Sequence, residues 1–335
     1  MSTFITGSSG FVGLALAEHL LAAGRDVVGY DLAPPPPAAL EAFAGLPGRF
    51  AAVAADVRDG AALAEAMRRH RPRRLVAMAA ITADARRERA APQAIFDVNV
   101  GGVLAALSAA ADVGVERAVH VSSGSAYGAG GRAAQPLREA DAPLLPEGLY
   151  GMSKCAAEQA ARRFCGLAGL PLAIGRLGTC FGPWEADSGV RDTPSAPLQA
   201  LRLARRGREA VLPRAGLRDW LYVRDAAAAI AALLDAGRWS HPVYNLAAGH
   251  EWTVAQWCEA LAARYPAFSW RMAAPGEAAN VDYYADYDRA SLDIARLRAD
   301  TDFAPRYGLA ESLADFLDWA ARHGAGFLPA EDAHA

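Results

Sequence analysis

Lysine is almost absent from this sequence. Of the 34 basic residues only the one at position 154 is Lys, and all the others are Arg. An ammonium is a compact charge with three rotatable donors, whereas a guanidinium is a broad planar fork, so Arg does not replace Lys where a small donor is needed. Because the composition disfavours lysine everywhere else, we expect Lys154 to have a chemical role.

Cysteine is also scarce, and no metal-binding pattern is present. The four cysteines show no metal-ligand spacing and the seven histidines form no cluster. Such usage is typical of reduced thiols in a cytoplasmic protein, and it predicts that the chain holds no metal. The formal net charge of −3 gives no reason to expect nucleic acid or a membrane surface as a partner.

Long hydrophobic runs are missing as well. Hydrophobic residues make up 53% of the chain, yet no apolar run approaches the length that crosses a membrane. The first predicted strand begins at Ser2, so we expect no signal peptide and a cytoplasmic location. A chain of 335 residues can bury a large core and is long enough for two lobes.

A glycine-rich segment follows the first predicted strand, Ser2–Thr6. It reads Gly7-Ser8-Ser9-Gly10-Phe11-Val12-Gly13, and helical periodicity then runs from Leu14 to Gly24. Without side chains, such a turn brings its backbone N–H groups up to a pyrophosphate at the positive end of a helix dipole. Strand, turn and helix together predict a dinucleotide site, the alternative being a tight turn without a ligand.

The second predicted strand, Asp26–Tyr30, ends at Asp31, about 18 residues after the last glycine of the turn. A carboxylate at this position suits two free ribose hydroxyls and repels a 2′-phosphate. No Arg in the turn offsets that repulsion, so NAD is the expected cofactor rather than NADP.

Strands and helices alternate through the first half of the chain, which predicts an α/β fold with a Rossmann-type, doubly wound parallel sheet. We expect a NAD-binding domain of residues 1–177 plus about 218–248, and a smaller C-terminal substrate-binding lobe of about 178–217 and 249–330. The further predicted strands are Phe50–Ala54, Arg74–Ala79, Arg117–Ser122, Leu172–Arg176, Trp220–Val223 and Val243–Leu246, the last two rejoining the sheet. The predicted helices are Ala61–His70, Asn99–Val113, Gly148–Ala168, Ala226–Ala236, Trp252–Tyr265 and Leu309–His323.

The single lysine follows Tyr150 by four residues, so on a helix the two side chains face the same way. An ammonium beside a phenol favours the phenolate and lowers the phenol's pKa. The pair can therefore serve as an acid/base near neutral pH, unless the spacing is a coincidence.

Taken together, these features resemble the extended short-chain dehydrogenase/reductase family, in its NAD-dependent epimerase/dehydratase branch, over nearly the whole chain. The motifs that carry the resemblance are Thr6-Gly7-Ser8-Ser9-Gly10-Phe11-Val12-Gly13, Asp56-Val57, Asn99, Ser122-Ser123-Gly124-Ser125-Ala126-Tyr127-Gly128, the pair Tyr150 and Lys154, and Arg218-Asp219-Trp220-Leu221-Tyr222-Val223. They are specific for fold and cofactor and less specific for the substrate.

The resemblance implies a catalytic set of Ser123, Tyr150 and Lys154. Tyr150 would exchange a proton with a substrate hydroxyl while a hydride passes to or from the nicotinamide. Ser123, or alternatively Ser125, would donate a hydrogen bond to the reacting oxygen. Strand-end capping is the alternative for the serines, and a structural role is the alternative for Asn99. The implied cofactor-binding residues are Gly7, Ser9, Gly10, Phe11, Val12, Gly13, Asp31, Asp56, Val57, Ala79, Asn99, Ser122, Tyr150 and Lys154.

The substrate is expected to be a sugar, a sugar acid or a polyol. Arg218 matches the family's diphosphate-binding Arg, but a second such Arg is missing from Ala274-Pro275-Gly276-Glu277. An Asn common after the sixth strand is replaced in Arg176-Leu177-Gly178-Thr179, and no amide-rich uridine-binding segment is evident around Asp192–Pro197. Arg191 could bind a carboxylate or a small phosphate, or form an ordinary ion pair. The implied substrate contacts are Ser123, Ser125, Tyr150, Arg191 and Arg218.

Simple hydride transfer is the expected chemistry. The family's dehydratases place an Asp-Glu pair after the catalytic hydroxyl and its decarboxylases a Glu in the same segment, but here Gly124 and Ser125 follow Ser123. The alternatives are a nucleoside-diphosphate-sugar 4-epimerase and a NAD-binding sensor without turnover. The resemblance further implies a homodimer through helices Asn99–Val113 and Gly148–Ala168.

Overall fold

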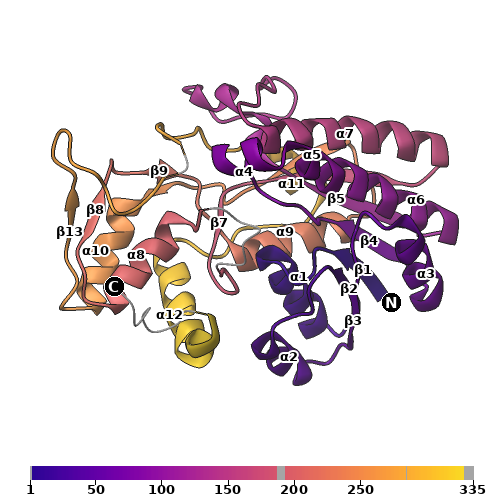
Figure 1. The fold of residues 1–335 in the computed structure, drawn as a ribbon, viewed down its shortest axis with the longest axis horizontal. Coiled ribbons are helices and arrows are strands. Elements are labelled where there is room, and N and C mark those ends of the chain that lie inside the picture. The colour runs from indigo at the N-terminus through magenta and orange to yellow at the C-terminus, as the bar shows by residue number, and fades with distance from the viewer. Residues whose placement is uncertain (1, 187–192, 284, 328–335) are drawn as a thin grey trace.

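A seven-stranded parallel sheet lies at the centre of the computed structural model, which describes residues 2–186, 193–283 and 285–327 (Figure 1). The strand order is β11-β6-β5-β4-β1-β2-β3, so the direction of winding reverses between β1 and β4. These strands are β1 (Ser2–Thr6), β2 (Asp26–Asp31), β3 (Phe50–Ala54), β4 (Arg74–Ala77), β5 (Arg117–Ser123), β6 (Leu172–Leu177) and β11 (Val243–Leu246). The predicted Rossmann-type fold is confirmed.

Helices cover both faces of the sheet (Figure 1). On one face α1 (Phe11–Ala22) packs against α9 (Val223–Asp235), and on the other α6 (Val103–Val113) lies between α3 (Gly60–His70) and α7 (Leu149–Ala168). Successive residues of a strand point to opposite faces of the sheet, so Phe4 and Ile5 pack in two different hydrophobic clusters. Because both faces are covered, the strands are apolar along their whole length. The other helices are α2 (Pro37–Ala44), α4 (Ala85–Ala90), α5 (Pro92–Phe96), α8 (Ala196–Arg205), α10 (Val254–Arg264), α11 (Ala295–Asp300) and α12 (Leu309–Phe327).

Three small sheets lie outside the central one. β7 (Cys180–Phe181) pairs with β10 (Leu221–Tyr222), β9 (Leu217–Arg218) with β12 (Trp252–Thr253), and β8 (Ala210–Leu212) with β13 (Trp270–Met272). Figure 1 shows β8, β13, α8 and α10 together at the end of the molecule opposite β3.

The expectation that Trp220–Val223 rejoins the central sheet is wrong. Only Leu221 and Tyr222 are extended, and they pair with β7, while Val223 already begins α9. The other predicted return strand, Val243–Leu246, does lie in the central sheet beside β6.

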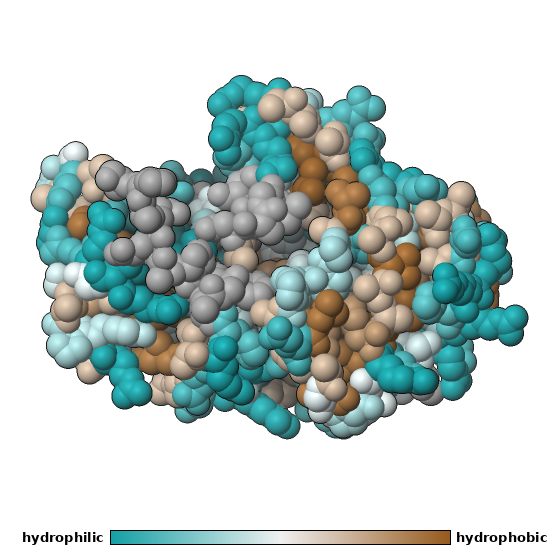
Figure 2. Space-filling model, turned by 60° about the horizontal axis from the view of Figure 1, so that its bottom comes forward, coloured by the Kyte–Doolittle hydropathy of each residue, from teal (hydrophilic) through white to brown (hydrophobic). Residues whose placement is uncertain are grey.

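The expectation about hydrophobic runs also needs correction. The helical run Pro92–Val113 is long and apolar enough to cross a membrane by length and composition, a test that core helices of soluble proteins also pass. Its C-terminal part, α6, packs against α3 and α7. The face of the molecule in Figure 2 shows separate hydrophobic patches among hydrophilic residues rather than a continuous band.

Candidate active site

The glycine-rich turn lies where β1 ends, at the point where the strand order reverses. The Thr6 hydroxyl oxygen accepts hydrogen bonds from the N–H groups of Met78 and Ala79, which holds the ends of β1 and β4 together. These bonds also explain why β4 stops at Ala77 and not, as predicted, at Ala79. In parallel α/β sheets, ligands bind at such a switch point.

Two glycines of this turn have no room for a side chain. Gly7 has a φ of 77°, and a Cβ there would lie 2.8 Å from the Cα of Ala79. A Cβ on Gly13 would lie 2.1 Å from the Gly7 carbonyl oxygen. Helix α1 then begins at Phe11, after Gly10, without a side-chain cap. The turn is therefore shaped for backbone groups to approach a ligand closely, as a pyrophosphate site requires.

Asp31 lies beside this turn. Its carboxylate accepts hydrogen bonds from the N–H groups of Ser9, at 2.9 Å, and Ala33, and burial raises its pKa while those bonds lower it. The Ser9 hydroxyl donates to the carbonyl of Ala33. The predicted ribose-binding carboxylate thus lies next to the predicted pyrophosphate turn.

The residues predicted for the adenine end lie just after β3, the strand next to β2. Asp56 accepts two or more hydrogen bonds from the Arg58 guanidinium, which hold the pKa of this carboxyl below its usual value. Val57 packs on Gly102, where a Cβ would lie 2.6 Å from its methyl group. An open hollow of about 570 Å³ is lined there by Asp56, Arg58, Asp59, Asp97 and Gly101.

Helix α7 carries Tyr150 and Lys154 to the end of β5. The Lys154 ammonium is buried, donates a hydrogen bond of 3.1 Å to the Val121 carbonyl, and lies 5.8 Å from the centre of the Tyr150 ring. Burial lowers the pKa of Lys154 to about 8, and the Glu158 carboxylate partly offsets this effect. Val121 is the only hydrogen-bond partner of this ammonium among the described residues, so donors remain for a ligand.

The Ser123–Ala126 turn presses against the start of α7. A Cβ on Gly151 would lie 2.6 Å from the Ser125 carbonyl oxygen, and the Cys155 thiol donates to the carbonyl of Ala126. The Ser123 hydroxyl oxygen accepts the N–H of Ser125, so Ser123 caps the short helical turn Gly124–Ala126. Its own O–H stays available as a donor.

Two other predicted residues are held within the protein. The Asn99 amide exchanges hydrogen bonds with both backbone groups of Ile81 and donates to the Ser153 hydroxyl, which in turn donates to the Tyr150 carbonyl. The Asn99 side chain therefore braces the turn of α7 that carries the Tyr-Lys pair. The Ser122 hydroxyl donates to Glu158, away from the turn.

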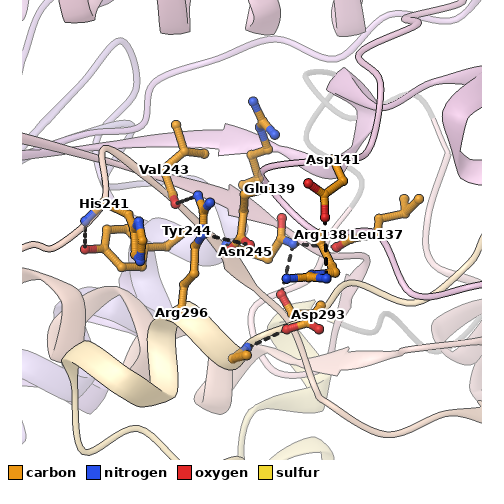
Figure 3. Close-up of polar contacts among 12 residues, drawn as sticks. Leu137, Arg138, Glu139, Asp141, His241, Val243, Tyr244, Asn245, Asp293 and Arg296 are labelled. Atoms are coloured by element: carbon orange, nitrogen blue, oxygen red, sulfur yellow. Dashed lines mark hydrogen bonds and ion pairs between the residues drawn. The ribbon is translucent and has the colours of Figure 1, made fainter.

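A buried polar network behind the site was not predicted. Glu158 binds the Arg176 guanidinium at 2.7 Å, Arg176 donates to the Tyr127 hydroxyl, and that hydroxyl donates to Asn245. Asn245 donates to the carbonyls of Leu137 and Asp293 and through its N–H to Glu139 (Figure 3). The one sequence signal for this network was the position of Glu158, one helical turn after Lys154.

Arg218, a predicted substrate contact, is nearly buried. It is 9% exposed, its guanidinium contacts the Thr179 hydroxyl at 3.4 Å, and it lies 5.4 Å from the Trp220 ring. A small hollow of about 50 Å³ is lined by residues that include Thr179, Arg214, Gly216, Arg218 and Trp220. The predicted substrate contact Arg191 lies outside the described residues. Among those described, no group of three or more His, Cys, Asp or Glu side chains could hold a metal ion.

Comparison with known proteins gives one matching family. Its model, described as the NAD-dependent epimerase/dehydratase family, matches residues 3–247. The dTDP-glucose 4,6-dehydratase of Xanthomonas campestris pv. campestris is 26% identical over 334 residues, 94% of this chain and 92% of its own. The UDP-glucose 4-epimerase of Mycolicibacterium smegmatis is 29% identical over 325 residues, covering 95% and 98% of the two chains.

The fold is also similar to solved structures. DesIV from Streptomyces venezuelae, a dTDP-glucose 4,6-dehydratase solved with NAD bound, superposes with a TM-score of 0.78 at 25% identity. The match covers 98% of this chain and 99% of DesIV. The relatives thus include both dehydratases and epimerases.

Proposed function

Because the chain belongs to the NAD-dependent epimerase/dehydratase family, we propose that its Ser123, Tyr150 and Lys154 transfer a hydride and a proton at a secondary hydroxyl of a sugar or sugar acid. It is an NAD-dependent enzyme of the extended short-chain dehydrogenase/reductase type. The observation that carries the proposal is the sole lysine of the chain, buried 5.8 Å from the Tyr150 ring at the end of β5.

The residues around the switch point fit NAD. Gly7 and Gly13 leave room for a pyrophosphate, Asp31 would accept hydrogen bonds from ribose hydroxyls, and the remaining donors of Lys154 would bind the second ribose. NAD supplies a hydride acceptor when it is bound. The proposed adenine contacts are Asp56 and Val57.

The protein's own groups handle the proton. The Tyr150 phenolate, which the nearby Lys154 charge stabilises, takes the proton of the substrate hydroxyl and becomes the neutral phenol. In the reverse direction the phenol returns that proton. The O–H of Ser123 donates to the substrate oxygen, since the Ser123 hydroxyl only accepts in its bond with the N–H of Ser125 and its donor is left for the substrate. Ser125 has its carbonyl against Gly151, and its hydroxyl is the second candidate for this contact.

Dehydration is not proposed, although several relatives are dehydratases. The two residues after Ser123 are Gly124 and Ser125, and neither carries a carboxyl group that could protonate a leaving hydroxyl. Net oxidation or epimerisation remains. A nucleoside-diphosphate-sugar 4-epimerase is the second candidate, supported by the similarity to the Mycolicibacterium smegmatis epimerase.

We further propose a cytoplasmic homodimer whose subunits each combine a NAD-binding domain and a smaller C-terminal lobe at the predicted boundaries. Exposed apolar side chains on α7 and α5 support the dimer, because they would be covered in it: Met152 is 41% exposed, Leu167 68% and Phe96 36%.

The test is NADH formation by the purified protein with NAD, over free sugars, sugar acids, polyols and nucleotide sugars. Tyr150→Phe should lower kcat about 10²- to 10⁴-fold, since the acid/base is lost, while the variant should still bind NAD. Tyr265→Phe, at the end of α10, is the matched control and should keep full activity.

Three other results would change the proposal. Conversion of a nucleotide sugar into its epimer without net NADH would establish the second candidate function. Full activity of Tyr150→Phe would reject the catalytic assignment. NAD binding without turnover of any compound would indicate a sensor.

A further inference from the structure

Two arginines near the site lack ion-pair partners among the described residues. Arg218 has only its 3.4 Å contact with the Thr179 hydroxyl and its position over Trp220. The Arg289 guanidinium makes no hydrogen bond or ion pair with any other described residue, and its Nε atom is buried. By contrast, Arg214 binds Asp288 at 2.7 Å and two backbone carbonyls, and Arg176 binds Glu158.

The two guanidinium groups lie near the ends of β5, which carries Ser123, and of its neighbour β6. In the register of β5 and β6, Ser123 pairs with Leu177, and Thr179 follows two residues later. A Cβ on Gly124, the residue after Ser123, would lie 3.6 Å from Nη1 of Arg289. Arg289 therefore lies beside the end of β5 and Arg218 beside the end of β6.

The backbone around Arg289 is fixed in place. The N–H of Ala290 donates to the Gly131 carbonyl at 2.9 Å, and the N–H of Leu292 donates to the Asp219 carboxylate at 2.8 Å. The stem of Arg289 packs over Gly131, where a Cβ would lie 2.7 Å from its Cγ. Its guanidinium is thus held against the Ser123–Gly124 turn and not free in solvent.

The charges around the two arginines do not balance. Asp288 is already paired with Arg214, which leaves the buried Asp219 to face both Arg218 and Arg289. Burial raises the pKa of Asp219 to about 7, so its negative charge is itself weakened near neutral pH. Burial, and after it the charge of Arg289, lower the pKa of Arg218 to about 10. An added anion would relieve this excess of positive charge.

We propose that Arg218 and Arg289 together bind an acidic group of the substrate, a carboxylate or a phosphate, next to the hydroxyl that reacts at Ser123. Guanidinium groups bind both anions with paired hydrogen bonds. Arg289 thereby supplies the second cation that is missing from Ala274–Glu277. This inference rests on the proposed function for one point, the position of the reacting hydroxyl at Ser123.

The test measures binding without turnover, so that it does not depend on the reaction. NAD-loaded Tyr150→Phe protein is titrated by calorimetry with D-glucuronate, D-glucose 6-phosphate, UDP-glucose and neutral D-glucose. At least one acidic probe should bind, and R218Q and R289Q should each weaken it about tenfold or more. R289K, which keeps the charge but loses the paired donors, should weaken binding less than R289Q does.

Arg298 provides the matched control, because it is an exposed arginine on α11 without an ion pair to another described residue. R298Q should bind as the parent protein does. Which acidic probe binds identifies the group as a carboxylate, a phosphate or a diphosphate. Unchanged binding in R289Q, equal affinity for D-glucose, or no binding of any acidic probe would overturn the proposal. Loss of turnover in Tyr150→Phe tests the proposed function separately.

Discussion

Lys154 keeps its charge in a part of the protein that water hardly reaches. Its ammonium is 2% exposed and has one backbone partner, the Val121 carbonyl. The groups that face it are Glu158 on α7, His120 on β5 and the Tyr150 ring. His120 carries little positive charge at neutral pH, because burial and the charge of Lys154 lower its pKa to about 3. The buried ammonium therefore lowers the stability of the folded protein, as expected for a group with a catalytic role.

Removing this charge should stabilise the protein without cofactor at pH 7. The folded pKa of Lys154, about 8, lies below its ordinary value of 10.5, so folding disfavours the ammonium at every pH below about 8. Lys154→Met should therefore raise the apparent Tm at pH 7. The advantage should shrink between pH 8 and pH 10.5, because the folded lysine is already neutral there while the unfolded lysine gains less and less from holding its proton.

Calorimetric melting of both proteins at pH 7, 9 and 10.5 checks this expectation. Arg162→Met, on an exposed position of α7, is the control and should show no such trend. A Tm difference that stays constant over this range would contradict the buried-charge argument. Lys154→Met should also lack activity at every pH.

The turn between β1 and α1 shows how an element is built around a ligand. Gly13 is buried against the Gly7 carbonyl, so α1 can start close to the end of β1. A side chain there would meet backbone atoms, which cannot rotate away as a flexible side chain can.

Gly13→Ala should separate α1 from the turn. We expect a loss of NAD affinity of about tenfold or more and a lower free energy of unfolding by about 2 kcal/mol. Gly166→Ala, on the exposed side of α7 with open space around its Cβ, should instead be neutral or stabilising by up to about 1 kcal/mol. Urea unfolding and NAD titration measure both effects, and a Gly13→Ala protein that binds NAD normally would contradict the assignment.

Elements with strong local signals were predictable from the sequence, and those set by long-range contacts were not. The first five strands and α7 follow from apolar runs and periodicity, and each lies within two residues of its predicted ends. Helix α8 was missed because Gly, Pro and Arg surround it and its start depends on the Ser195 cap. Trp220–Val223 looked like a strand of the central sheet, but β10 pairs with β7 through contacts that no local pattern encodes.

The same distinction applies to the site. Gly7, Gly13, Asp31, Tyr150 and Lys154 have fixed spacings along the chain, so their proximity could be predicted. Arg289 reaches the Ser123 turn only because the loop before α11 crosses over Gly131, and nothing in its neighbouring sequence indicates this.

At the scale of the whole molecule, Asn245 joins segments that are far apart in the chain. Its side chain accepts a hydrogen bond from Tyr127 near the catalytic turn. It also donates to the carbonyls of Leu137, in the following loop, and Asp293, before α11 (Figure 3). Through Tyr127 and Arg176 the same network continues to Glu158 on α7. The C-terminal segment that carries Arg289 is therefore tied to the helix that carries Lys154.

Replacing Asn245 by Leu should loosen this connection. It would remove one hydrogen bond each from the Tyr127 hydroxyl, the Leu137 carbonyl and the Asp293 carbonyl, so we expect the free energy of unfolding to fall by about 3 kcal/mol. Asn280→Leu, at an exposed position where water can replace the lost hydrogen bonds, should cost about 1 kcal/mol or less. Urea unfolding measures the loss in both variants. Similar losses would show that the buried network stabilises the protein no more than an exposed pair of hydrogen bonds does.

Because the only lysine is buried, proteolysis at this residue can report local unfolding of the active site. A protease that cuts after lysine has one target, between residues 154 and 155, in the middle of α7. Cleavage there requires that helix to unfold, so the rate at which two fragments appear measures how often the centre of the active site comes apart. Added NAD should slow that cleavage in proportion to its binding, with no need for a known substrate.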